Sequence, residues 1–105
     1  MEQRRTRRFS LHLPLAITRS GADRVAMAGQ TRNISSSGVL FTAGRGPELG
    51  GPIEYIITLN GEGAQAVNLR CIGKVLRVDP DAAKSVPDYQ VAATLERYEF
   101  VRTVA

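Results

Sequence analysis

The stretch LHLPLAITRSGADRVAMAGQT, residues 11–31, contains two alternating segments on either side of a turn. In residues 11–17, leucine or isoleucine occupies every second position, which is the period of a half-buried β-strand. Residues 20–23 are Ser-Gly-Ala-Asp, and Ser, Gly and Asp are typical of tight turns. Alternation resumes over residues 25–31. The stretch therefore predicts a β-hairpin made of the first two strands.

The register of this hairpin determines which other parts of the chain meet. A turn centred within residues 20–23 places Ser10 opposite Asn33 and Arg8 opposite Ser35. We therefore expect the residues that precede the first strand to lie beside the segment that follows the second.

The rest of the chain continues the same pattern of short strands. Four further segments have strand character, and turns rich in Gly, Pro, Asn or Asp separate several of them: residues 39–41, 53–59, 67–78 and 88–95. A short helix is predicted over residues 96–104. Because closure of a sheet removes its exposed edges, the pattern favours a mainly all-β fold. We expect a six-stranded antiparallel β-barrel or split barrel with a short C-terminal helix.

The length and the cysteine usage limit the organisation of the chain. A chain of 105 residues suits one domain, and we expect a flexible N-terminal arm over residues 1–9 and a single barrel domain over 10–105. Cys71 is the only cysteine, so the chain has no internal disulfide, and a reducing cytoplasm is the expected compartment. No apolar run approaches the ~20 residues that span a bilayer, so membrane insertion is not expected.

Positive charge is concentrated near the start of the chain. Residues 1–32 contain seven arginines and two acidic residues, a local charge of +5, whereas the whole chain carries +4. The remaining residues therefore sum to −1. This distribution indicates an anionic partner for the N-terminal third.

Two motifs lie at the places that the hairpin brings together. Arg4 and Arg8 have the spacing RxxxR directly before the first strand. Asn33, Ser35 and Gly38 have the spacing [D/N]xSxxG directly after the second, followed by the apolar residues Val-Leu-Phe. This pair of motifs, in this order, resembles the PilZ domain, the bacterial module that binds the second messenger cyclic di-GMP. The resemblance covers nearly the whole chain.

The resemblance implies a ligand site made of Arg4, Arg8, Asn33, Ser35 and Gly38. The chemistry of these residues agrees, because guanidinium groups match phosphate oxygens and the O6/N7 edge of guanine with two donors each. Asn33 would offer an oxygen to the donors of a guanine edge. Gly38, which has no Cβ, would permit a positive φ and close approach of the ligand.

Two neighbours of the first motif complete the expected ligand contacts. In the resemblance, Gln3 lies where the family often adjusts whether one ligand or a stacked pair binds, and Arg5 adds supporting charge. Cyclic di-GMP is the expected ligand, and we expect no cofactor and no metal.

No catalytic constellation is visible in the sequence. One His, one Cys and scattered carboxylates form no nucleophile–base pair, and the glycine-rich stretch GRGPELGG lacks the lysine of a phosphate-binding loop. We therefore expect a receptor that acts on an unidentified protein partner and not an enzyme.

Two other functions remain open. A PilZ-like adaptor would act through protein contacts without a ligand. A small β-barrel that binds single-stranded nucleic acid would use the basic arm, but such proteins stack bases on exposed aromatic residues. The chain has no Trp and only three Tyr and three Phe, which makes nucleic acid the less favoured partner.

Overall fold

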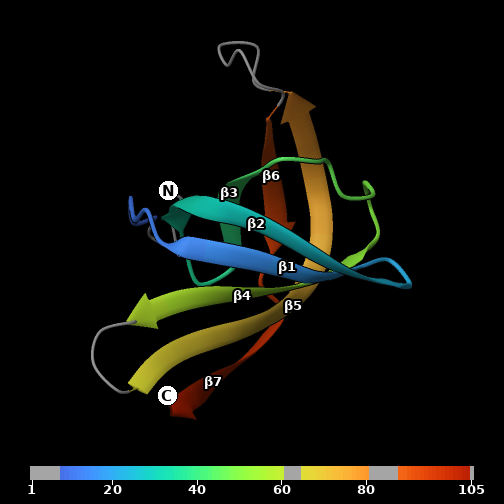
Figure 1. The fold of residues 1–105 in the computed structure, drawn as a ribbon. Coiled ribbons are helices and arrows are strands. Elements are labelled where there is room, and N and C mark those ends of the chain that lie inside the picture. The colour runs from blue at the N-terminus through green and yellow to red at the C-terminus, as the bar shows by residue number, and fades with distance from the viewer. Residues whose placement is uncertain (1–7, 61–64, 81–87, 105) are drawn as a thin grey trace.

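Seven antiparallel β-strands make up the computed structural model, which describes residues 8–60, 65–80 and 88–104. The strands are β1 Pro14–Ser20, β2 Asp23–Ile34, β3 Gly38–Ala43, β4 Pro52–Asn60, β5 Gln65–Pro80, β6 Tyr89–Thr94 and β7 Arg97–Val104. Their order in the sheet is β4-β1-β2-β3-β6-β5-β7, and β4 also pairs with β5. The first six strands therefore close into a barrel, as predicted, and β7 is added to it at the edge of β5 (Figure 1).

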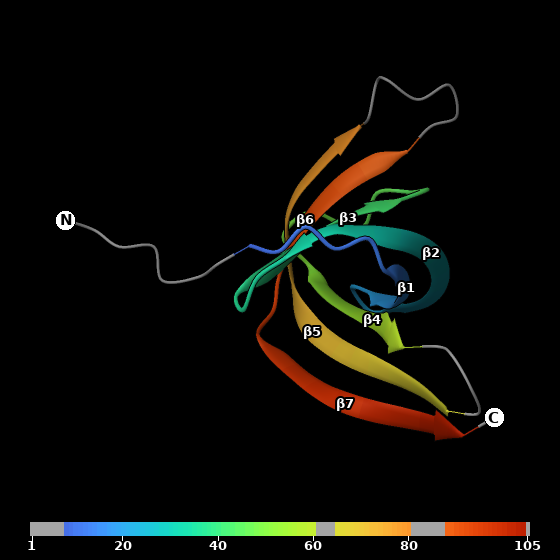
Figure 2. The ribbon, with the colours of Figure 1, turned by 90° about the vertical axis from the view of Figure 1, so that its left-hand side faces the viewer.

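The predicted C-terminal helix is wrong. Residues 97–104 form β7, which pairs with β5 from Arg97 opposite Ile72 to Val104 opposite Gln65. The composition of this segment explains the outcome, because aromatic and β-branched residues favour strands and an edge of β5 is free to accept them. Figure 2 shows β7 running alongside the first half of β5.

Strand β5 belongs to two parts of the molecule. Its first half lies between β4 and β7, and its second half pairs with β6. Gly73 lies at the junction, where a Cβ atom would overlap the carbonyl oxygen of Thr94 in β6. A glycine is therefore required for the two strands to pass each other.

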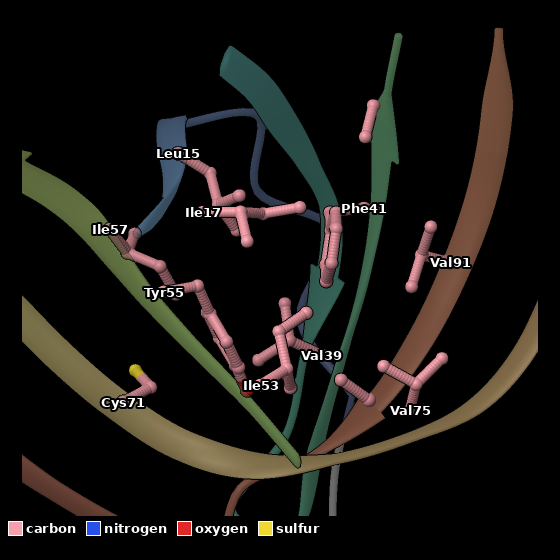
Figure 3. Packing of buried hydrophobic residues seen from close by; sticks show 12 residues of the cluster. Leu15, Ile17, Val39, Phe41, Ile53, Tyr55, Ile57, Cys71, Val75 and Val91 are labelled. Atoms are coloured by element: carbon pink, nitrogen blue, oxygen red, sulfur yellow. The ribbon is translucent and has the colours of Figure 1, made fainter. Parts of the chain in front are cut away.

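The interior of the barrel is filled mainly by apolar side chains of β1, β3, β4, β5 and β6. Twelve of these side chains are buried: Leu15, Ile17, Val39, Phe41, Ala43, Ile53, Tyr55, Ile57, Cys71, Val75, Val91 and Ala93 (Figure 3). Tyr55 packs against Phe41 with ring centroids 5.7 Å apart, and its hydroxyl donates to the Thr94 carbonyl at 3.0 Å. Burial raises the pKa of the Cys71 thiol to about 12, so Cys71 is a protonated core residue at neutral pH.

The first hairpin has the expected turn and nearly the expected register. Gly21 in its turn has a φ of 63°, a conformation that suits glycine. Ser20 lies opposite Asp23 as predicted, and an irregularity between Ile17 and Arg19 shifts the pairing by one residue in the rest of the hairpin. Leu15 and Ile17 point into the core as the alternation predicts, whereas Leu11 is 44% exposed before the strand begins.

Candidate functional site

The segment before β1 is attached to the far end of β2. Phe9 forms a bridge with Ile34, in which the Phe9 amide donates to the Ile34 carbonyl at 2.8 Å and the Ile34 amide donates back at 2.9 Å. This pairing has the register predicted from the turn. The start of the described chain is therefore brought beside the segment that follows β2, as expected.

A buried threonine holds this segment in place. The hydroxyl of Thr31, which is fully buried in β2, accepts a hydrogen bond from the Leu13 amide at 2.8 Å and donates to the Leu11 carbonyl. Sequence reasoning missed this role. The available signal was a threonine at the end of the inward-facing series of β2, where an apolar residue would be ordinary.

Arg8 and Asn33 meet at the end of the hairpin. The Arg8 guanidinium donates through Nη1 to Asn33 Oδ1 at 2.7 Å. Arg8 is exposed and Asn33 is partly buried, so the arginine reaches over the asparagine from the solvent side. Two residues from the two predicted motifs, 25 positions apart, are thus in direct contact.

Ser35 and Gly38 shape the turn between β2 and β3. Ser35 is 5% exposed, and its Oγ accepts from the Gly38 amide at 3.2 Å and from the Ser37 amide at 3.3 Å. The Ser35 amide in turn donates to the Gly38 carbonyl at 2.9 Å. In the structure, the Ser35 side chain therefore bonds to the backbone of its own turn.

Gly38 is explained in the structure by its packing against β6. Among the described residues only Gly21 and Gly50 have a positive φ, so Gly38 does not use the positive φ that a glycine permits. Close approach explains this glycine instead, because a Cβ atom would lie 3.0 Å from the Ala93 carbonyl oxygen. This proximity lets β3 pack tightly against β6.

A cleft of about 500 Å³ opens beside this turn. Arg8, Asn33, Ser37 and Gly38 line one end of it, and residues of β3, β6 and β5 line the rest. The cleft has the size of a small-molecule site. The structure thus brings Arg8, Asn33 and Gly38 together, with Ser35 beneath them in the turn. Gln3, Arg4 and Arg5 lie outside the described residues, and their assignment stays a prediction.

The floor of the cleft is a row of side chains that crosses four strands. Asn33 pairs with Leu40, Leu40 with Ala92, and Ala92 with Arg77, so the row runs across β2, β3, β6 and β5. Leu40 and Ala92 each lie between two buried neighbours and therefore face outward. The row forms part of the outer surface of the barrel.

A β-bulge stands at each end of this row. In β2 the register shifts between Thr31 and Asn33, and in β5 it shifts between Val75 and Arg77. Thr31 and Val75 point into the core, and regular alternation would turn Asn33 and Arg77 inward as well. The extra residue of each bulge turns these two polar side chains outward to the cleft.

Arg77 and the bulged residue beside it were missed by sequence reasoning. Arg77 Nε lies 2.9 Å from Asp79 Oδ2, and both side chains are well exposed. Leu76, the extra residue of the bulge, is 62% exposed and also lines the cleft. The far end of the cleft thus carries a second guanidinium group next to an apolar side chain.

A smaller hollow of about 290 Å³ lies on the other half of β5, and Arg70, Tyr98 and Glu99 contribute to its lining. Arg70 joins two strands there, with Nε 3.0 Å from Glu54 Oε2 in β4 and Nη1 3.1 Å from Glu99 Oε2 in β7. The hydrogen bond from Arg70 lowers the pKa of the Glu54 carboxyl, partly opposed by burial. Arg70 is therefore part of a structural ion network.

Neither metal-binding clusters nor membrane helices are found in the part of the chain that the structure describes. There, no group of three or more His, Cys, Asp or Glu side chains is placed to hold a metal ion. The same residues include no helix with the length and apolar character needed to cross a membrane.

The structure is a small β-barrel with a cleft on its outer surface, and Arg8, the β2–β3 turn and strands β3, β5 and β6 line this cleft. The chain belongs to the PilZ domain family, whose model matches residues 2–99. Domains of this family generally bind cyclic di-GMP and are binding or adaptor modules rather than enzymes. The family predicted from the two motifs is therefore confirmed.

Comparison with solved structures supports the same fold. The chain is similar to the Bacillus subtilis inhibitor of motility (MotI/DgrA), with a TM-score of 0.68 and 18% sequence identity. The match covers 94% of this chain and 45% of that protein, so the chain spans less than half of its length. No curated protein matches the sequence.

Proposed function

We propose that this protein is a cyclic di-GMP receptor that binds the messenger in the cleft between its N-terminal arginines and the β2–β3 turn. The contact between Arg8 and Asn33 at 2.7 Å carries the proposal, because it joins the two motifs at the mouth of the cleft. Membership of the PilZ family adds to it.

Each residue of the site has a chemical role in this proposal. Arg4 and Arg8 bind phosphate oxygens or the O6/N7 edge of guanine, and Arg5 adds positive charge. The Asn33 oxygen, which accepts from Arg8 in the free protein, accepts from the Watson–Crick edge of a guanine. Ser35 keeps the turn in shape through its backbone contacts, and Gln3 directly precedes Arg4 in the sequence.

The tight packing at Gly38 serves the same site. Gly38 and Ala93 both line the cleft, and the absence of a Cβ atom at Gly38 lets the β2–β3 turn lie close to β6. The ligand and the N-terminal arginines that bind it would then lie on the same face of the barrel.

Calorimetric titration with cyclic di-GMP tests the proposal. We expect a dissociation constant in the micromolar range or tighter, and Arg8→Ala should weaken binding about ten- to hundredfold, the size of a charge-assisted hydrogen bond. Arg24→Ala, which removes an exposed arginine at the opposite end of the hairpin, is the matched control and should bind like wild type. A wild-type protein that ignores cyclic di-GMP at high concentration would disprove the proposal.

Base recognition is tested with cyclic di-AMP. The Asn33 oxygen needs the donors N1–H and N2–H of guanine, and adenine lacks both in this arrangement. Wild type should therefore prefer cyclic di-GMP, and Asn33→Ala should lose much of that preference. Equal binding of the two dinucleotides would remove Asn33 from the role of base reader.

The output of such a receptor is an interaction with a protein partner. Ligand that engages Arg8 alters the surface beside the Phe9–Ile34 bridge, where a partner reads the bound state. Pull-downs with and without cyclic di-GMP test this step, and capture that depends on ligand and is lost in Arg8→Ala is expected.

A PilZ-like adaptor that works without ligand is the second candidate. The observation in its favour is the outer strand β7, on which Tyr98 and Phe100 are 60% and 65% exposed and stack edge to face at 6.3 Å. Exposed aromatic residues are enriched in protein interfaces. Capture that is unaffected by cyclic di-GMP and by Arg8→Ala, but lost in Phe100→Ala, would favour this function.

A further inference from the structure

The two ends of the cleft, at Asn33 and at Arg77, are built in the same way. Asn33 and Arg77 are the two ends of the row that forms the floor, and each follows a bulge that turns it outward. Three strand spacings separate the two positions, a span of about 14 Å. Bulges are over-represented beside binding sites because they re-aim side chains, so two of them on one row indicate that both ends are used.

Arg77 forms an ion pair that is exposed to solvent. Its Nε lies 2.9 Å from Asp79 Oδ2, with the Arg77 and Asp79 side chains 66% and 57% exposed. Asp79 lies two residues further along the same strand and therefore on the same face. Ion pairs this exposed contribute little to stability, because water already solvates both groups. A stronger anionic partner can thus displace Asp79 at small cost.

We propose that Arg77 is a further ligand-binding arginine of the cleft and that Asp79 competes with the ligand for it. This inference rests on the proposed function and adds to it a residue outside the two motifs. Cyclic di-GMP is two-fold symmetric, with two phosphates and two guanines. Arg8 serves one half of the molecule, and Arg77 at the other end of the floor serves the second.

The remaining surface of the cleft suits this arrangement. Leu76 is exposed beside Arg77, and Leu40 and Ala92 face outward between the two ends. Apolar side chains of this kind pack against the faces of purine bases. Asp79 then sets the affinity, because its carboxylate repels the phosphates and neutralises Arg77 until the ligand replaces it.

Titration of four proteins with cyclic di-GMP tests the inference: wild type, Arg77→Ala, Asp79→Asn and the double variant. We expect Arg77→Ala to weaken binding about tenfold or more and Asp79→Asn to tighten it several-fold. The gain from Asp79→Asn should disappear in the Arg77→Ala background, because the two residues act on one another. Asp23→Asn, the same charge change at the distant hairpin turn, is the control and should have no effect.

The outcomes separate the inference from the proposed function. If wild type does not bind, the proposed function fails and this inference with it. If wild type binds and Arg8→Ala does not, while Arg77→Ala binds like wild type, only the inference fails. If Asp79→Asn weakens binding, or tightens it equally without Arg77, competition between Asp79 and the ligand is disproved. Circular dichroism and thermal unfolding of each variant establish that the fold is retained.

Discussion

The two halves of β5 each carry an arginine paired with carboxylates, and the two arginines are held in different ways. Arg70, in the regular half, contacts Glu54 in β4 and Glu99 in β7, so it links three strands. Arg77, in the half that begins with a bulge, contacts only Asp79 of its own strand among the ion pairs observed in the described residues. Arg70 thus joins neighbouring strands, whereas the observed ion pair of Arg77 stays within one strand.

The largest effect is expected from a change at the junction of the two halves. Gly73→Ala would drive a Cβ atom into the Thr94 carbonyl, and we expect a loss of about 3 kcal/mol or more of unfolding free energy. Gly44→Ala is the matched control, because a Cβ atom there meets open space, and it should change stability by less than about 0.5 kcal/mol. Denaturant unfolding measures both. Equal stability of the two variants would show that the halves of β5 are not joined as described.

An intermediate effect is expected from removing either arginine of β5, Arg70 or Arg77, because one change should affect stability and the other should affect binding. Arg70→Ala should lower the Tm by a few degrees, because Glu54 and Glu99 lose the residue that joins their strands, and it should leave cyclic di-GMP binding unchanged. Arg77→Ala should do the reverse and reduce binding with almost no change in Tm. Thermal unfolding and calorimetry on the same samples measure both quantities. Weakened binding in both variants would end the distinction between the two arginines.

The smallest effect concerns acid stability of the regular half. The pKa of Glu54 lies below its ordinary value of 4.5, mainly because of the hydrogen bond from Arg70. A carboxyl with a lowered native pKa stabilises the fold above the ordinary value, and that contribution is lost as the pH falls through the native pKa. Below pH 4.5, the unfolding free energy of wild type should therefore fall more than that of Glu54→Gln. We expect the difference between the two proteins to be smaller than about 1 kcal/mol. Unfolding curves from neutral pH to acid that run parallel in the two proteins would contradict this.

The local pattern of apolar and turn residues in the sequence was sufficient to predict most of the barrel. Period-two alternation and turn residues placed the six strands, and the strand predicted over 53–59 is Pro52–Asn60 in the structure. The hairpin turn also predicted that Arg8 and Phe9 would lie beside the NxSxxG segment, since register follows from turn geometry. The predicted helix failed because the pairing of β7 with β5 joins residues far apart in the sequence, for which the local pattern carries no signal.

The bulges explain why only part of the lining of the cleft was predicted from the sequence. The family resemblance pointed to Asn33, but strict alternation in β5 places Arg77 on the inner face with Val75. A bulge forms between two paired strands, and the pairing of β5 with β6 is invisible to a reading of β5 alone. Arg77 could therefore be recognised only once the partner strand was in place. Thr31 was missed for a related reason, because its hydroxyl partners lie in another segment.

The row from Asn33 to Arg77 also has a consequence for folding. About half of the chain length lies between Leu40 and Ala92, so the row exists only after distant strands have paired and the barrel has closed. Topologies with such distant pairings fold slowly. A ligand bound to this row stabilises only the closed state, by about 2.7 kcal/mol at a hundredfold excess over its dissociation constant. For a receptor of this design, the messenger would act on the folding equilibrium as well as on the surface, and would protect destabilised variants from unfolding.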